Sequence, residues 1–425
     1  MIAVVVCIFL AMAVVLPAQT AEEMATAQAA EQAARKAYAE KSYGDFLTQM
    51  LAANAARPNH PRLIYNLASA YAVNGDTEKA LALIERLAKM GLTYAVEKDL
   101  NFKPLLSNER FIAAQARFAK NREPLNASQK AFSVEDKTLI AESLAYNPKT
   151  QTYYLGSVHR RKIVAVDKNG IAADFSKPAD GLWSVLGMKV DAKRGWLWVC
   201  STAFPQMQGS TAADKGRAGI FKYELATGKL IKKYILPAGE EHALGDLIID
   251  RDGNVFATDS VAPVIYTIKT KGDSIEEFLR SNMFASLQGL AFDDAGTNLF
   301  VADYSKGIFR VNMSNKQVVQ LKPADDITLL GIDGLYFYNG DLIAIQNGVS
   351  PNRVLRFSVG AGQITAQQVL EANHPDFNEP TLGVIIGDEF YFIANSQWGS
   401  VNDKAELAVD KLRPPVVLKL SLKAH

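Results

Sequence analysis

The chain has little cysteine and almost no net charge, and each shortage excludes a class of protein. Only two cysteines occur in 425 residues, and Cys7 lies in the N-terminal apolar run, so Cys200 alone would remain if that run were removed. A single cysteine can form neither an intramolecular disulfide nor a cysteine metal site. The 46 basic and 45 acidic side chains leave a formal charge of +1, whereas nucleic-acid binding is driven by clustered cations. We therefore expect no nucleic-acid partner.

Sequence motifs of several enzyme classes are also missing. There is no G-x-S-x-G nucleophile elbow, no H-E-x-x-H zinc pair and no phosphate-binding glycine loop. The five histidines, at positions 60, 159, 242, 374 and 425, show no metal-ligand spacing. Any catalysis must therefore come from another arrangement of side chains.

One long hydrophobic run is present, at the N-terminus. Residues 1–18 read MIAVVVCIFLAMAVVLPA and are followed by the polar QTAEEMATAQ. The run is short for a membrane span and suits the hydrophobic part of a secretory signal. Residues 1–21 are therefore predicted to be an export signal, which makes the mature protein secreted or periplasmic. The run is preceded by no Lys or Arg, so an uncleaved membrane anchor is the alternative.

Residues 22–123 are predicted to form a small α-helical domain, because Ala, Glu, Lys, Arg and Leu dominate and apolar residues recur three and four apart. The stretch 59–91 carries small Ala68 and Ala80 on either side of Gly75, and it resembles a tetratricopeptide helical pair. One clear repeat is fewer than a free-standing solenoid needs. We therefore expect a helical cap on the next domain or a docking module for a protein partner.

Residues 130–422 carry a repeat of short strands. Six similar strand openings recur at intervals of 43 to 59 residues, and each is followed by a second apolar run. They read ESLAYNP at 142, LGMKVDA at 186, GDLIIDR at 245, QGLAFDD at 288, DGLYFYN at 333 and LGVIIGD at 382. A repeat of this length with about four strands per unit is the signature of a β-propeller blade. The predicted fold class is therefore mainly β, a six-bladed β-propeller preceded by the small helical domain.

The two ends of the repeat region are predicted to meet in one blade. PPVVLKLSL at 414–422 supplies a third strand for blade six, and KAFSVE at 130–135 supplies its outer strand. Such closure removes the exposed edges that an open sheet would leave.

Polar residues recur at one end of the predicted channel. The first strand of each blade lines the channel and the second runs back antiparallel, so the residue before the first and the residue after the second lie at the same end. The positions before the first strands include Glu142, Gln288 and Asp333, and the wider ring after the second strands is Ser157, Ser201, Asp259, Asp303, Gln346 and Asn395. Carboxylate and amide oxygens that converge from different blades suit a hard divalent cation such as calcium.

A structural role is the alternative for these polar residues. Asp commonly caps the turns at strand ends, and we favour that role for Asp259 and Asp303. Glu142 and Asp333 are harder to explain in this way, because both stand against apolar sequence, where an unpaired carboxylate is costly.

Three hairpins carry a family resemblance. QGLAFDDAGTNLFVADYSKGIFRV, GDLIIDRDGNVFATDS and DGLYFYNGDLIAI resemble the senescence-marker-protein/gluconolactonase family, which is related to strictosidine-synthase-like propellers. The resemblance covers roughly residues 130–422. It implies six blades, one divalent metal in the channel, usually calcium, and lactone hydrolysis in several members.

The resemblance also implies the metal ligands. They are Glu before the first strand of blade one, Asn before those of blades three and four, and Asp before that of blade five. By position, Glu142 and Asp333 match, whereas Gln288 replaces one Asn and Gly245 the other. Gly245 offers no side chain, so a ligand is lost unless Asp246 or water takes its place. The expected metal ligands are therefore Glu142, Gln288 and Asp333.

The expected reaction is hydrolysis of a lactone or small ester. Metal coordination would polarise the carbonyl, and Asp333 would activate water as the catalytic base. The candidate substrate-binding residues are His159, Asp246, Asp303, Asn395 and Trp398, the last in a long loop of blade six. The alternative is a non-catalytic propeller that binds a ligand or a protein, with the helical domain as the interaction surface; the lost Asn at position 245 favours this alternative.

Overall fold

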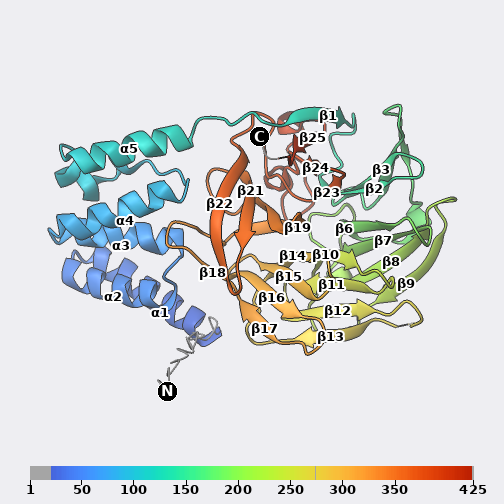
Figure 1. Cartoon of the computed structure of the whole chain (residues 1–425), viewed down its shortest axis with the longest axis horizontal. Coiled ribbons are helices and arrows are strands. Elements are labelled where there is room, and N and C mark those ends of the chain that lie inside the picture. Colours follow the sequence, from blue (N-terminus) through green and yellow to red (C-terminus); the bar gives the residue numbers. More distant parts are fainter. Residues whose placement is uncertain (1–20, 273, 424–425) are drawn as a thin grey trace, which may run out of the picture.

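The computed structural model describes residues 21–272 and 274–423, which form a helical region beside a ring of β-sheets (Figure 1). Apart from Ala21, which begins the first helix, the predicted export signal at residues 1–21 lies outside the described residues. None of the helices in the described part of the chain has the length and apolar character to cross a membrane.

The helical region contains five α-helices within the described residues. They are α1 (Ala21–Ala39), α2 (Tyr43–Ala56), α3 (Pro61–Val73), α4 (Thr77–Lys89) and α5 (Glu109–Asn121), with short 3-10 helices at Val96–Lys98 and Leu100–Leu105. Ala68 and Ala80 are fully buried, which lets α3 and α4 pack closely. Gly75 adopts a φ of 80° in the turn between them, a conformation that favours glycine. The predicted helices are confirmed, and the tetratricopeptide resemblance stays a prediction.

The described residues from Gln129 onward form six sheets of at least four strands, so the predicted six-bladed propeller is confirmed. Blade one is β2 (Ala141–Asn147), β3 (Thr152–Ser157), β4 (Ile163–Val166) and β5 (Ala172–Asp174). Blade two is β6 (Ser184–Asp191), β7 (Trp196–Thr202), β8 (Ala218–Glu224) and β9 (Leu230–Ile235). Blade three is β10 (Leu244–Ile249), β11 (Val255–Asp259), β12 (Val264–Ile268) and β13 (Glu276–Arg280).

The second half of the ring follows the same order. Blade four is β14 (Leu287–Phe292), β15 (Asn298–Asp303), β16 (Gly307–Asn312) and β17 (Val318–Gln320). Blade five is β19 (Ile332–Tyr338), β20 (Asp341–Gln346), β21 (Arg353–Val359) and β22 (Gln363–Ala372), with the short β18 (Lys322–Pro323) parallel to β22. Blade six is β23 (Gly383–Ile386), β24 (Glu389–Ile393), β25 (Val416–Ser421) and β1 (Gln129–Ser133).

Blade six joins the two ends of the propeller sequence. β1 pairs antiparallel with β25, and Ser133 lies opposite Val416. The prediction that residues 130–135 and 414–422 share a blade is therefore confirmed. The first strands of neighbouring blades pack against each other in the order β23, β2, β6, β10, β14 and β19, and together they surround the central channel.

The first strands of blades one to five each contain a β-bulge near their start. The pairing register shifts between Ala141 and Ser143 in blade one, and at the matching place in blades two to five. Glu142, Gln288 and Asp333 occupy these bulges, so they lie inside the first strands rather than before them as predicted. Bulges turn side chains away from the regular alternation and are frequent beside active sites.

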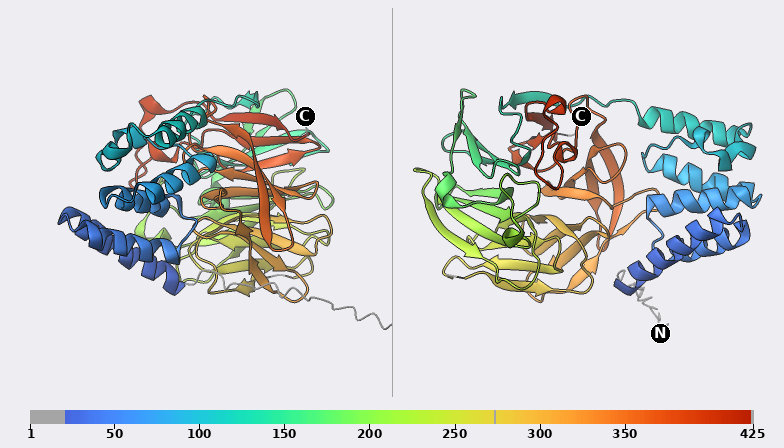
Figure 2. Two further views of the ribbon diagram at one scale, coloured as in Figure 1. Left: turned by 60° about the vertical axis from the view of Figure 1, so that its left-hand side comes forward. Right: turned by 180° about the vertical axis from the view of Figure 1, so that it is seen from behind.

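The helical region contacts the propeller at blades four and five, and Figure 2 shows the helices stacked together on one side of it. The fully buried Arg353 of β21 donates from Nη1 to the carbonyl oxygen of Met90 at 2.8 Å. The Thr93 backbone N–H donates to the Ser350 carbonyl oxygen at 2.8 Å. Ser350 follows the second strand of blade five, so the helices lie at the channel end that carries Glu142 and Asp333.

Candidate functional site

Glu142 is held at the channel by two donors from blade six. Its side chain is 6% exposed, and Oε2 accepts hydrogen bonds from Ser396 Oγ at 2.8 Å and from the indole Nε1 of Trp398 at 2.6 Å. The neighbouring Thr381 hydroxyl donates to the Glu142 backbone carbonyl at 2.8 Å. Blade six therefore fixes both the main chain and the carboxylate of Glu142.

Asp333 is held by a chain of polar side chains from blades four and five. Its Oδ2 accepts a hydrogen bond from Asn347 Nδ2 at 2.8 Å. The Tyr304 hydroxyl donates to Asn347 Oδ1 at 3.1 Å, which fixes the orientation of the amide. Asn347 Nδ2 also donates to the Pro380 carbonyl oxygen at 3.0 Å, so three blades meet at this amide.

The two carboxylates resist ionisation together. Burial raises the pKa of Glu142 well above its ordinary value, and the negative charge of Asp333 raises it further. Burial also raises the pKa of Asp333, to about 6, with a smaller contribution from Asp246, while the Asn347 hydrogen bond acts in the opposite direction. Two buried carboxylates whose charges repel each other are stabilised when one of them binds a proton or when a cation lies nearby. The electrostatics therefore favour a positively charged occupant.

Gln288 of blade four lies next to Gly245 of blade three. Its Nε2 is 3.5 Å from Ser286 Oγ. A Cβ built on Gly245 would lie 3.3 Å from Gln288 Oε1, so the missing side chain leaves room for this longer amide. The structure therefore brings the amide oxygen of Gln288 to the channel beside position 245.

Asp246 follows Gly245 directly, and its Oδ2 is buried without a hydrogen-bond partner among the described residues, so its role as a substitute ligand stays a prediction. It stands at the second bulge position of blade three, is 1% exposed, and receives a hydrogen bond from the Leu247 N–H at 2.8 Å. Its Oδ1 also lies 3.3 Å from Lys189 Nζ of blade two. Burial raises the pKa of Asp246, and the Lys189 charge opposes that rise. Asp246 influences the site by its charge and packs between blades two and three.

Two of the predicted substrate-binding residues are engaged with the backbone. Asp303 is fully buried, and its carboxylate accepts from the backbone N–H groups of Ala285, Ser286, Ser305 and Lys306. Asn395 is fully buried, accepts from the Val416 N–H at 2.7 Å and donates to the Pro414 carbonyl oxygen at 3.0 Å. This geometry favours the turn-capping role for both.

The other two predicted substrate-binding residues are His159 and Trp398, and of these only Trp398 bonds to Glu142. His159 is 5% exposed, and its Nδ1 lies 2.9 Å from the Gln206 carbonyl oxygen, within the loops of blades one and two. Trp398 reaches the site directly through the hydrogen bond to Glu142, and its ring packs edge-on against Phe204. Trp398 therefore positions a carboxylate, a role that the sequence did not indicate.

The donor set fits a hard divalent cation only in part. Glu142, Asp333 and Gln288 offer carboxylate and amide oxygens, which calcium prefers. Among residues 21–272 and 274–423, however, no group of three or more His, Cys, Asp or Glu side chains is placed to hold a metal. A bound cation would therefore depend on the Gln288 amide and on water for its remaining ligands.

The sequence reasoning missed Tyr304, Asn347 and Ser396, and one signal could have found them. Each follows directly after a position of the predicted wider ring, namely Asp303, Gln346 or Asn395. Successive side chains of an extended strand point to opposite sides. The residue of the wider ring therefore bonds to the backbone of its own blade, whereas the residue that follows it reaches the channel.

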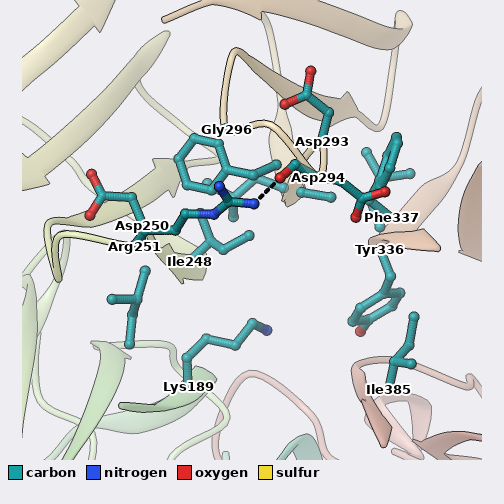
Figure 3. A pocket seen from close by; sticks show the side chains of 15 residues that line it. Lys189, Ile248, Asp250, Arg251, Asp293, Asp294, Gly296, Tyr336, Phe337 and Ile385 are labelled. Carbon is teal, nitrogen blue, oxygen red and sulfur yellow. Dashed lines mark hydrogen bonds between the residues drawn. The ribbon is translucent and has the colours of Figure 1, made fainter. Parts of the chain in front are cut away.

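A separate cavity of about 310 Å³ lies at the opposite end of the first strands, and neither Glu142 nor Asp333 lines it. Figure 3 shows the ammonium group of Lys189 pointing into this space and Tyr336 on the facing wall. The Arg251 guanidinium donates across the rim to the Asp294 carbonyl oxygen. This second cavity is lined by charges of both signs, because Asp250, Asp293 and Asp294 lie around it together with Lys189 and Arg251.

The comparisons with known proteins concern the fold. The chain matches no protein-family model, and it matches no curated protein sequence. Among solved structures, it is similar to a luciferin-regenerating enzyme, with 14% identity, a TM-score of 0.49, and coverage of 71% of this chain and 96% of the other. It is also similar to a PQQ-bound aldose sugar dehydrogenase from Streptomyces coelicolor, with 13% identity, a TM-score of 0.48, and coverage of 69% and 97%.

A third similar structure is a gluconolactonase from Xanthomonas campestris, with 15% identity, a TM-score of 0.46, and coverage of 68% of this chain and 88% of the other. These proteins are named for different activities, and likeness at this level assigns none of them to this chain. The fold and the site define a six-bladed β-propeller with paired carboxylates at one end of its channel.

Proposed function

We propose that the protein hydrolyses a lactone or small ester at the channel end that carries Glu142 and Asp333. The supporting observation is the pair of buried carboxylates, held by separate hydrogen-bond networks and each with a raised pKa. Such a pair has the electrostatic character of a catalytic or cation-binding site rather than of a packing contact.

In this proposal, Glu142, Gln288 and Asp333 hold a divalent cation, and their oxygen ligands suit calcium. When bound, the cation supplies Lewis-acid polarisation of the substrate carbonyl. Hydrogen bonds hold two of these ligands in place without the cation. Ser396 and Trp398 donate to Glu142, and Asn347 donates to Asp333.

Asp333 is the proposed general base. In the metal-free site burial raises the pKa of Asp333 to about 6. A bound cation would lower that pKa again, so Asp333 acts as the base through an oxygen that the cation leaves free. The water oxygen forms a bond to the carbonyl carbon, and the bond from that carbon to the ester oxygen breaks. The proton passes to the leaving oxygen, which gives a hydroxy acid from a lactone.

The test combines metal analysis with a panel of lactones. We expect the purified protein to contain a divalent metal and to turn over at least one lactone. Asp333→Asn should lower kcat/KM by at least about 100-fold, because general-base catalysis contributes about 10²–10⁴-fold. Asp294→Asn, at the exposed far end of the channel, is the matched control and should leave turnover unchanged.

A non-catalytic binding propeller is the second candidate function, and it is supported by the lost ligand at Gly245. Bound metal without turnover of any lactone would favour it. Turnover that survives Asp333→Asn would contradict the proposed role of this residue as base.

A further inference from the structure

A cavity of about 420 Å³ lies where the helical region meets blades four and five. The helical side contributes the start of α3 and the chain around Thr93. The propeller side contributes Tyr304, Gly331 and Gly348. The volume falls within the range of about 300–1,000 Å³ that is typical of small-molecule sites.

The helical wall of this cavity is rich in hydrogen-bond donors. Arg57 donates from Nη2 to the Ser305 carbonyl oxygen at 2.6 Å, whereas its Nε is buried without a hydrogen-bond partner among the described residues. Arg62 also lines the cavity, and it keeps its side chain 57% exposed while it pairs with Glu31 at 2.9 Å. The two arginines repel each other: burial lowers the pKa of Arg57, and the positive charge of Arg62 lowers it further.

The same wall also carries a neutral histidine and the N-terminus of a helix. His60 precedes α3, and burial together with the neighbouring arginines lowers its pKa to about 4, so the ring adds no charge at neutral pH. Its Nδ1 is buried and has no partner within the described part of the chain. The N-terminus of α3 adds the positive end of a helix dipole.

The cavity adjoins the proposed active site. Tyr304 is one of its lining residues, and the same Tyr304 hydroxyl donates to Asn347, whose amide holds Asp333. A substrate that reaches Asp333 from this side would therefore extend over Tyr304 toward Arg57 and Arg62. The helical region thus forms one wall of this cavity.

We propose that this cavity binds a carboxylate group of the substrate, with Arg62 and Arg57 as its charge partners. The inference rests on the proposed function and names its substrate class: a lactone or ester that carries an additional carboxylate. Charge-assisted hydrogen bonds from arginine suit such a group.

The test compares two lactones that differ in one group. Glucarolactone carries a carboxylate where gluconolactone carries a hydroxymethyl group. By calorimetry, we expect the protein to bind glucarolactone about tenfold more tightly, as one charge-assisted hydrogen bond would provide. Arg62→Gln should remove this preference, and Arg62→Lys should keep part of it.

Arg35→Gln is the matched control, because Arg35 pairs with the same Glu31 at 2.8 Å but does not line this cavity. Equal binding of the two lactones, or a preference that survives Arg62→Gln, would overturn the inference. Calorimetry needs no turnover, so a carboxylate preference without hydrolysis would uphold the cavity while contradicting the proposed hydrolase.

Discussion

At the scale of single residues, the ionisation of Asp333 links the site to stability. Its pKa in the folded protein is about 6, above the ordinary value of 3.8. The folded state therefore binds more protons than the unfolded state between these two values. Stability from this group is present below about pH 4 and is lost as the pH rises through about 6.

Asp333→Asn should therefore stabilise the metal-free protein at pH 8, because the amide avoids placing a charge beside Glu142. We expect the free energy of unfolding to rise by on the order of 1–3 kcal/mol. The difference should shrink as the pH falls through about 6 and disappear only well below 3.8, where Asp333 is protonated in both states. Urea unfolding with a chelator present measures it, and a wild-type protein that is the more stable at pH 8 would contradict the assigned charge penalty.

Trp398→Phe tests the indole as a positioning group for Glu142. The substitution keeps an aromatic ring against Phe204 but removes the Nε1 donor. If Glu142 is a metal ligand, calcium affinity measured by calorimetry should fall about 10–100-fold, as is usual when a partner of a ligand is lost. Trp183→Phe is the control, since Trp183 Nε1 donates to Asp214; an equal loss in both variants would contradict the assigned role.

Residue identities alone indicated Glu142 and Asp333, because a carboxylate in apolar sequence needs an explanation. They did not indicate Asn347 or Ser396, since a neutral polar side chain at a strand end is common. Which of two successive residues faces the channel depends on the strand register, and one position of slip exchanges the two faces. The strand register is known only from the strand pairing in the structure, so the sequence could not identify these two residues.

At the scale of the strand, the bulges couple neighbouring blades. A Cβ on Gly289, in the bulge of β14, would lie 2.6 Å from the carbonyl oxygen of Asp333 on β19. Gly334 similarly approaches Thr381 of blade six, at 3.3 Å from the carbonyl oxygen. Gly289 follows Gln288, and Gly334 follows Asp333. Because neither glycine has a Cβ, the first strand of its blade can pack closely against the next blade.

Gly289→Ala should disturb Asp333 without touching its side chain. Because the added methyl meets backbone atoms, the strands must separate, and we expect a loss of about 1–3 kcal/mol in the free energy of unfolding. Lactone turnover or calcium binding should fall with it. Gly362→Ala is the control, since a Cβ there meets no atom within 4 Å. If Gly289→Ala and Gly362→Ala had the same free energy of unfolding, the close packing at Gly289 would not contribute to stability as proposed.

At the scale of the whole molecule, Arg353 joins the two regions. It is fully buried, donates from Nε to Gln346 Oε1 at 2.7 Å, and reaches the carbonyl oxygen of Met90 at the end of α4. Burial lowers its pKa to about 10, which leaves it charged at neutral pH. The negative end of a helix dipole favours a cation at this position.

Arg353→Met should weaken the connection between the helices and the propeller. The Met90 carbonyl and the Gln346 amide would lose a buried partner, and we expect a cost of about 2–4 kcal/mol. Calorimetry should show a lower unfolding temperature. Arg356→Met, on the same strand but bonded to Leu422 within the propeller, is the control. A single transition at the wild-type temperature in Arg353→Met would contradict the proposed link.

The propeller and the helical region were both predictable from the sequence, because repeat spacing and apolar periodicity are local signals. The placement of the helices was not, since it depends on contacts such as Arg353 with Met90 that join residues far apart in the chain. The cavity lined by Arg62 and Tyr304 was hidden for the same reason. Its two walls belong to different regions.

The pairing of β1 with β25 has a consequence for biosynthesis. Blade six takes one strand from Gln129–Ser133 and its neighbour from Val416–Ser421, so the ring stays open until β25 has left the ribosome. The helices, whose contacts are local, can fold far earlier, because short loops close quickly and long ones slowly. During translation, β1 would wait unpaired until β25, the last strand of the propeller to be made, is available.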